Sequence, residues 1–126
     1  MADENPESKV AARNSWQILP MPKWKSRLSF NRSFTQAEFQ RLAKGLIPES
    51  MDDKWFVFLE NNWLYFHRSW TGACIYQIRL TDDGEKYNVT EAWVNRNFKQ
   101  YKNVFKTLDK FLLGFLVNNL SSSKKV

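Results

Sequence analysis

Dense runs of aromatic and β-branched residues occupy the middle of the chain and predict a β-hairpin. Residues 55–60 and 63–68 form the two runs, and only Asn61 and Asn62 separate them. Adjacent asparagines tolerate the positive φ angles of a two-residue hairpin turn. Alternation along the strands then predicts an aliphatic face with Trp55, Val57, Leu59, Leu64, Phe66 and Arg68, and an aromatic face with Phe56, Phe58, Glu60, Trp63, Tyr65 and His67.

Two further strands are predicted after this hairpin. Gly72 suits the left-handed position of a three-residue loop, so we expect a third strand from Ala73 to Leu80. A turn at residues 82–84 precedes a fourth strand from Tyr87 to Val94. In this register Cys74, Tyr76, Ile78 and Leu80 share the aliphatic face, and Ile75, Gln77 and Arg79 share the aromatic face.

A short helix is predicted before the sheet. Thr35, followed three residues later by Glu38, forms a capping box that bonds the free amides of a helix N-terminus. Gly45 supplies a conformation that commonly ends a helix, and Pro48 prevents its continuation. We therefore expect a helix from Gln36 to Lys44.

A longer amphipathic helix is predicted near the C-terminus. Apolar residues recur there with helical spacing, while the lysines of this segment and Asp109 fall on the opposite side. A stripe of this length must be buried, so we expect it to pack on the aliphatic face of the sheet. The stripe consists of Tyr101, Val104, Phe105, Leu108, Phe111, Leu112, Phe115 and Leu116.

The expected fold class is α+β. A four-stranded antiparallel meander, with room for an extra N-terminal edge strand, packs against the short helix and the long C-terminal helix. Pro20 and Pro22 keep their neighbours extended, as an irregular segment or that edge strand would require. Residues 1–15 and 121–126 are expected to be disordered or loosely attached tails, which leaves a single domain over residues 16–120.

The composition predicts a folded domain without metal or cofactor. Hydrophobic residues make up 43% of the 126 residues and aromatic residues 16%, which is enough for one core. His67 and Cys74 are the single histidine and the single cysteine, so internal disulfides and the usual zinc patterns are excluded. The sequence also lacks the glycine motifs that bind phosphate.

Neither a secretory signal nor a membrane span is predicted. Residues 1–12 lack the apolar stretch of a signal peptide. The longest apolar run, residues 111–117, is interrupted by Gly114 and is too short to cross a bilayer. A lone cysteine suits a reducing compartment, so we expect a cytoplasmic protein without membrane contact.

The chain is basic. Nineteen Lys and Arg residues against thirteen Asp and Glu residues give a net charge of +6, which attracts polyanions at long range. Four lysines recur every three or four residues along the predicted C-terminal helix, either as a solvated face or as an electrostatic contact surface. They are Lys99, Lys102, Lys106 and Lys110.

The segment from Tyr65 to Gly72 is the strongest candidate for a site, because it places an imidazole, a guanidinium and two hydroxyls beside several rings. In a purely structural interpretation, His67 caps an aromatic face and Arg68 stacks on Trp70. An enzyme would use His67 as general acid or base, assisted by Ser69. The candidate binding residues are Trp63, Tyr65, His67, Arg68, Trp70 and Arg79.

The favoured function is a non-enzymatic module that binds a small molecule or a protein through the aromatic face. Single-stranded nucleic acid is an alternative ligand, because several proteins stack its bases on sheet-borne rings beside Arg and Lys. The strands contain no RNP-type motif. A small enzyme that uses His67 is the other alternative. The stacking platform would consist of Trp63, Tyr65, Arg79 and Tyr87.

Three strings of residues resemble those of a family of small, uncharacterised bacterial proteins. They are Pro20 to Trp24, Asp53 to Phe56 and Trp63 to Gly72, and the last is the most specific. The resemblance covers residues 19–103 and implies an intact domain. Similar segments accompany ADP-ribose-processing domains, so it also implies a nucleotide-linked role, but it carries over no catalytic residue.

Overall fold

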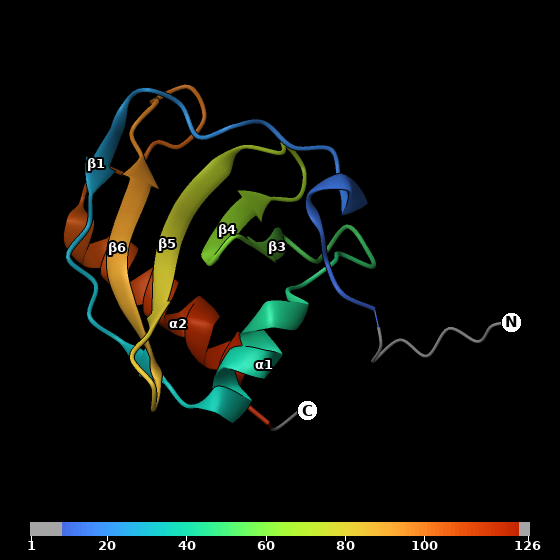
Figure 1. Cartoon of the computed structure of the whole chain (residues 1–126). Coiled ribbons are helices and arrows are strands. Elements are labelled where there is room, and N and C mark those ends of the chain that lie inside the picture. Colours follow the sequence, from blue (N-terminus) through green and yellow to red (C-terminus); the bar gives the residue numbers. More distant parts are fainter. Residues whose placement is uncertain (1–8, 124–126) are drawn as a thin grey trace, which may run out of the picture.

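The computed structural model describes residues 9–123, which form one curved antiparallel sheet and two α-helices (Figure 1). The chain is therefore α+β, with a short helix and a longer C-terminal one, as predicted. In chain order the elements are the 3₁₀ turn η2 (Arg13–Ser15), β1 (Lys25–Arg27), β2 (Ser33–Phe34), α1 (Gln36–Lys44), β3 (Trp55–Glu60), β4 (Trp63–Arg68), β5 (Cys74–Asp82), β6 (Tyr87–Asn95) and α2 (Lys106–Ser121).

The sheet has six strands in the order β1-β6-β5-β4-β3, and β2 pairs with β6 as well. The predicted meander is present as β3 to β6. The four-strand count was too low: the segment before α1 supplies the expected N-terminal edge strand as β1 and a further short strand as β2, and both pair with β6. Backbone bonds from Leu28 N–H to Ala92 and from Val89 N–H to Arg32 hold this segment in place.

The β3–β4 hairpin forms as predicted. Asn61 and Asn62 have φ angles of 53° and 69°, and the expected pairs, such as Phe58 with Tyr65, are present. Alternate residues therefore project to two faces. We call the helix-covered face the core face and the opposite one the outer face. Leu42 of α1 and Leu113 and Val117 of α2 share one core with Val57, Leu64 and Phe66 of the hairpin.

A β-bulge between β4 and β5 reverses the predicted faces of two residues. Gly72 has a φ of 80°, as the predicted loop requires. The register nevertheless shifts between Phe66 and His67, so that Cys74 pairs with His67 on the outer side and Ile75 joins the main core. The placement of Cys74 on the aliphatic face and Ile75 on the aromatic face was wrong, because the bulge adds one residue to β5.

Local hydrogen bonds define both ends of α1, as predicted. Glu38 N–H donates to Thr35 Oγ1 at 3.1 Å, and Thr35 N–H donates to Glu38 Oε1 at 2.9 Å. At the other end, Gly45 has a φ of 68°, and its N–H donates to the carbonyl of Leu42. The fully buried side chain of Leu42 then anchors the helix to the core face.

The helix α2 is present, but it begins at Lys106, after Lys99, Lys102 and Tyr101 of the predicted helix, and its buried face differs from the predicted one. Leu113 and Val117 are fully buried, whereas Phe111 is 74% exposed and Phe115 is 56% exposed. Asp109, which we expected on the solvent side, is fully buried. The prediction failed because it considered hydrophobicity alone. The hydrogen-bond and ion-pair partners of the Asp109 carboxylate turn that side of the helix toward the core.

Residues 9–19 cover one part of the outer face. Ala11 is buried against Phe56 and Phe58, and the ring of Trp16 stacks on Phe56 with centroids 6.0 Å apart. Residues 9–15 of the expected tail thus contact the sheet. Residues 1–8 and 124–126 of the expected tails lie outside the described residues, and Ser121 is the buried last residue of α2.

Candidate binding surface

The uncovered part of the outer face carries aromatic and charged side chains in two rows across β4, β5 and β6. In one row, Trp63 pairs with Arg79. Paired residues of an antiparallel sheet project to the same side, so the rows form one continuous surface. We call it the outer platform. Its members are Trp63, Arg79 and Glu91 in one row, and Tyr65, Gln77 and Trp93 in the other.

Trp93 of the outer platform contacts two cations and a carboxylate. The ammonium group of Lys25 lies 4.9 Å from its ring centroid, and the guanidinium of Arg27 lies 5.2 Å from it. Such cation–π contacts attract two cations from β1 to this ring. The indole N–H donates to Glu91 Oε2 at 2.7 Å, which orients the ring and occupies the carboxylate.

Arg13 lies at the Tyr65 end of the platform. Its guanidinium lies 5.4 Å from the ring centroid of Tyr65 and forms an ion pair with Glu60 at 2.5 Å. Hydrogen bonding to Glu60 raises the pKa of Arg13, and the same bond lowers the pKa of Glu60. Both carboxylates near the platform are thus engaged, whereas Arg79 is exposed and forms no hydrogen bond or ion pair within residues 9–123.

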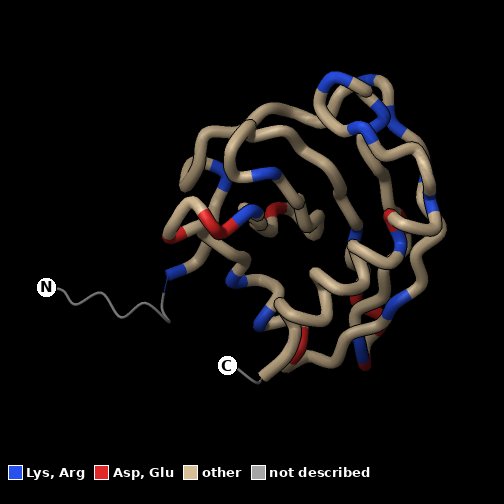
Figure 2. Tube along the Cα trace, turned by 180° about the vertical axis from the view of Figure 1, so that it is seen from behind, with Lys and Arg blue, Asp and Glu red and all other residues tan. Residues whose placement is uncertain are grey.

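A cavity of about 500 Å³ adjoins the platform at the edge of β6. Leu28, Val89 and Ala92 are buried residues that line it, and Arg27, Lys106 and Lys110 supply cations. Arg27 therefore belongs to both the cavity and the surroundings of Trp93. Figure 2 shows Lys and Arg positions gathered at the upper right, where β1 and the loop after β6 lie side by side.

His67 is not part of the accessible surface. Only 3% of the residue is exposed, and its Nδ1–H donates to the carbonyl of Gly72 at 2.8 Å. Its ring stacks on Phe58 with centroids 5.7 Å apart. Burial lowers the pKa of His67, which favours the neutral ring. This geometry favours the structural interpretation of His67 and leaves it inaccessible to a substrate.

The remaining predicted residues lie apart from the platform. Arg68 stacks on Trp55 at 5.2 Å, not on Trp70 as the structural interpretation expected. Trp70 is exposed in the β4–β5 loop, where Lys54 lies over its ring and a separate cavity of about 400 Å³ adjoins it. Tyr87, expected in the stacking platform, instead stacks on Phe39 of α1 at 3.7 Å, because its side chain projects to the core face.

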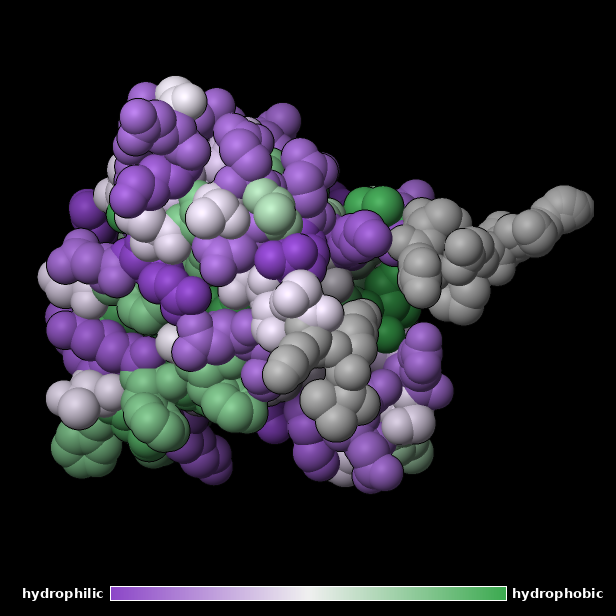
Figure 3. Space-filling model, turned by 90° about the horizontal axis from the view of Figure 1, so that it is seen from below, coloured by the Kyte–Doolittle hydropathy of each residue, from purple (hydrophilic) through white to green (hydrophobic). Residues whose placement is uncertain are grey.

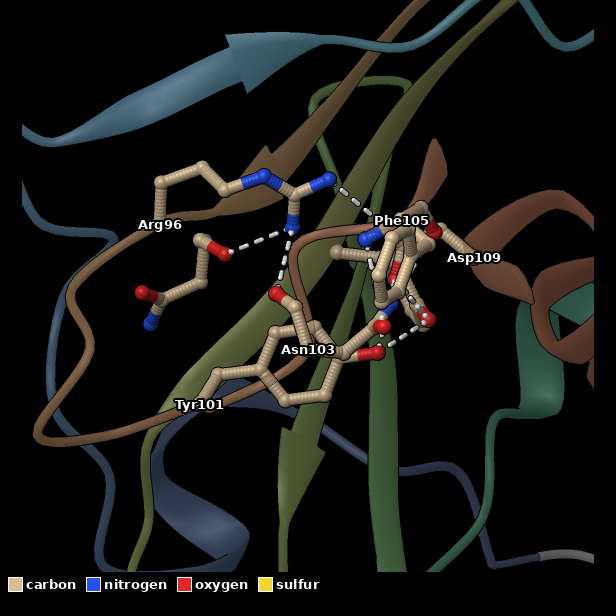
Figure 4. Close-up of polar contacts among 7 residues, drawn as sticks. Arg96, Tyr101, Asn103, Phe105 and Asp109 are labelled. Carbon is tan, nitrogen blue, oxygen red and sulfur yellow. Dashed lines mark hydrogen bonds and ion pairs between the residues drawn. The ribbon is translucent and has the colours of Figure 1, made fainter. Parts of the chain in front are cut away.

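A buried polar network joins α2 to the sheet (Figure 4). Asp109 accepts hydrogen bonds from the hydroxyls of Tyr76 and Tyr101 at 3.0 and 2.6 Å and pairs with Arg96 at 2.6 Å. The amide of Asn103 donates to Asp109 at 3.0 Å. Burial raises the pKa of both tyrosines, so both hydroxyls remain donors. Among the residues described, no buried side-chain nitrogen or oxygen lacks a partner, so this network is structural.

Of the residues in and around the outer platform, the sequence predicted Trp63, Tyr65 and Arg79 but not Trp93 or the two cations from β1. Alternation within the predicted fourth strand was a usable signal for Trp93, since its neighbours are apolar. Its face nevertheless depends on a second bulge, at Arg79 and Leu80, which no local pattern specifies. Lys25 and Arg27 reach this ring only through the pairing of β1 with β6.

The described residues contain neither a metal-binding cluster nor a membrane-spanning helix. Across residues 9–123, no three His, Cys, Asp or Glu side chains are grouped as a metal site would require. No helix in that part of the chain has both the length and the hydropathy needed to cross a membrane.

Comparison with known proteins gives no match, whether to a protein-family model, to a curated protein or to a solved structure. The bacterial family and the nucleotide-linked role implied by the resemblance therefore stay predictions. The candidate function rests on the geometry of the outer platform.

Proposed function

We propose that this chain is a non-enzymatic module that binds single-stranded nucleic acid on the outer platform. The observation that supports this most is the grouping of three half-buried rings with exposed cations on one uncovered sheet face. The rings are those of Trp63, Tyr65 and Trp93. Half-buried rings are held rigid and still offer a face to a base, which is the arrangement that sequence-tolerant stacking requires.

The cations would hold the phosphates. Arg79, which forms no hydrogen bond or ion pair within the described residues, lies beside Trp63 in the same row, while Arg27 and Lys25 flank Trp93 at the platform's edge. From Arg27 the basic track continues into the edge cavity through Lys106 and Lys110. A net charge of +6 adds long-range attraction for a polyanion.

Binding is favoured over catalysis because the platform lacks a free acid–base group. Glu60 and Glu91 are engaged by Arg13 and by the indole of Trp93. His67, the residue on which an enzyme would depend, is buried and bonded to Gly72.

The test is an amide and indole NMR titration of the labelled chain with a short oligothymidylate, and separately with ADP-ribose. We expect saturable shifts at the indole N–H groups of Trp63 and Trp93. Binding should weaken as salt rises, with a slope of about −0.7 per phosphate contact. Shifts with ADP-ribose alone would replace the polymer with a small nucleotide ligand, and no shift with either would exclude the proposal.

Matched variants locate the surface. Trp93→Ala should weaken oligothymidylate binding by roughly 1 to 3 kcal/mol, the range for losing one stacked base. Arg79→Ala should weaken it and reduce the salt slope by about one phosphate contact. Trp70→Ala is the control, because its ring is exposed but lies in the β4–β5 loop, and this variant should bind like the parent chain.

A further inference from the structure

The outward side of α2 is an exposed ridge of large apolar side chains, which we call the α2 ridge. Phe111 is 74% exposed, Phe115 is 56% exposed and Leu108 is 52% exposed. Val104 and Phe105, just before the helix, are 57% and 68% exposed and extend the ridge. Figure 3 shows a hydrophobic area at the lower left of the surface seen from below, on the side where α2 lies.

The sheet does not bury this ridge because the opposite side of α2 is already committed. Leu113 and Val117 are fully buried on the core face, and Asp109 is fixed there by Arg96. Turning the ridge inward would remove Asp109 from all its hydrogen-bond partners. The fold therefore requires the α2 ridge to be exposed in a single copy of the chain.

The area of the ridge suits a protein interface. A large apolar or aromatic side chain buries about 200 Å², so the exposed fractions of the five ridge residues sum to roughly 600 Å². That is at the upper limit of apolar patches on ordinary monomers. Two such faces together give roughly 1,200 Å², which reaches the lower bound for a stable interface before any flanking contact is added.

The distribution of charge around the α2 ridge indicates what kind of partner it suits. From Phe111 to Ser123 the chain carries no charged residue, and the lysines of α2, Lys106 and Lys110, face the edge cavity instead. An acidic partner helix or an anionic membrane would need cations beside the ridge, as amphipathic membrane helices have. An uncharged apolar face is complementary to an identical face, and a two-fold axis lets one patch serve both partners.

We propose that the α2 ridge is the interface between two copies of this chain. The two helices pack across a two-fold axis near Phe111, so that Phe115 of one copy meets the Leu108 end of the other. This arrangement is antiparallel and sets the helix dipoles in opposite directions. The sheet lies between α2 and the rings of the outer platform, and Lys106 and Lys110 face the edge cavity, so the dimer leaves the proposed nucleic-acid surface open.

The first test is sedimentation velocity of the chain at concentrations from roughly 1 μM to 1 mM. Dissociation constants of interfaces of this size fall in that range or below it. We expect a monomer–dimer equilibrium that tightens as salt rises, because salt screens repulsion between two chains of charge +6. Binding to oligothymidylate would weaken with salt, so the two proposals can fail separately.

Phe111→Asp should weaken the dimer at least tenfold, because it places a charge in the centre of the interface. Met51→Asp is the matched control, since Met51 is 72% exposed and lies far from α2 in sequence, and it should dimerise like the parent chain. Circular dichroism and the urea midpoint of both variants are the checks that each variant remains folded. For Phe111→Asp, unfolding by urea should be as cooperative as for the control.

Three results would overturn the proposal. One is a monomer at every concentration, and another is a dimer that Phe111→Asp leaves intact. The third is a monomeric chain that sediments with phosphatidylglycerol vesicles and loses this association in Phe111→Asp, which would assign the ridge to a membrane surface.

Discussion

Arg96 Nη2 lies 2.6 Å from Asp109 Oδ2. This ion pair joins the residue that follows β6 to α2, and the Asp109 side chain is fully buried. The guanidinium also donates to the carbonyls of Asn95 and Asn103, so it organises the loop between the two elements. The pair therefore fixes the rotation of α2 about its own axis. Its consequence is that Leu113 faces the core and Phe111 faces solvent.

Removing the carboxylate should be costly. Asp109→Ala leaves Arg96 without its counter-ion and the hydroxyls of Tyr76 and Tyr101 without their acceptor, so we expect a loss of about 3 to 5 kcal/mol in the free energy of unfolding. Urea unfolding followed by circular dichroism measures it. The exposed Asp52 provides the control, and Asp52→Ala should change stability little. A loss below 1 kcal/mol for Asp109→Ala would show that the network does not anchor the helix.

His67 should make stability depend on pH. Burial lowers its pKa in the folded chain below that of the unfolded chain, near 6.5, so acid favours the unfolded state. The stability that the neutral ring provides is fully present above about pH 6.5 and is lost as the pH falls through the folded pKa. The measurement is the free energy of unfolding between pH 8 and pH 5.

His67→Asn tests the assignment, because an amide N–H can still donate to the carbonyl of Gly72 but does not titrate. We expect the decrease between pH 7 and pH 5 to become smaller in this variant. An unchanged slope would mean that another group causes the pH dependence.

Gly72 and Gly84 form a matched pair for separating backbone strain from steric clash. Both have positive φ, 80° and 99°, but a Cβ at Gly72 would lie 2.7 Å from the carbonyl oxygen of Gln17, whereas a Cβ at Gly84 meets nothing within 4 Å. Gly84→Ala should cost about 1 to 2 kcal/mol from conformation alone. Gly72→Ala should cost clearly more by thermal or urea unfolding. Equal costs would mean that residues 17–19 move away freely.

Cys74 should be unreactive in the folded chain. Its side chain is buried, and burial raises its pKa to about 12, so the thiolate that attacks disulfide reagents is scarce at neutral pH. We expect reaction with an aromatic disulfide reagent only at the rate at which the protein opens. The chain has a single cysteine, so the signal is unambiguous, and fast labelling of native protein would contradict the buried position.

The elements that the sequence predicted correctly are those fixed by neighbouring residues. The hairpin turn depends on the φ angles of two adjacent asparagines, and the capping box of α1 depends on hydrogen bonds between residues three apart. Neither needs a partner that is distant in the sequence. Trp63, Tyr65 and Arg79 could be grouped for the same reason, because alternation and a short hairpin fix their side of the sheet.

Only the tertiary structure decided the features that depend on distant partners. A bulge exchanged the faces of Cys74 and Ile75, and Ala11, Trp16 and Ile18 packed on the phenylalanine rings that flank His67. The sequence by itself determined that α2 is amphipathic. Which side of it is buried was decided by Arg96, because a carboxylate can enter a core only where a counter-ion and hydrogen-bond donors already converge.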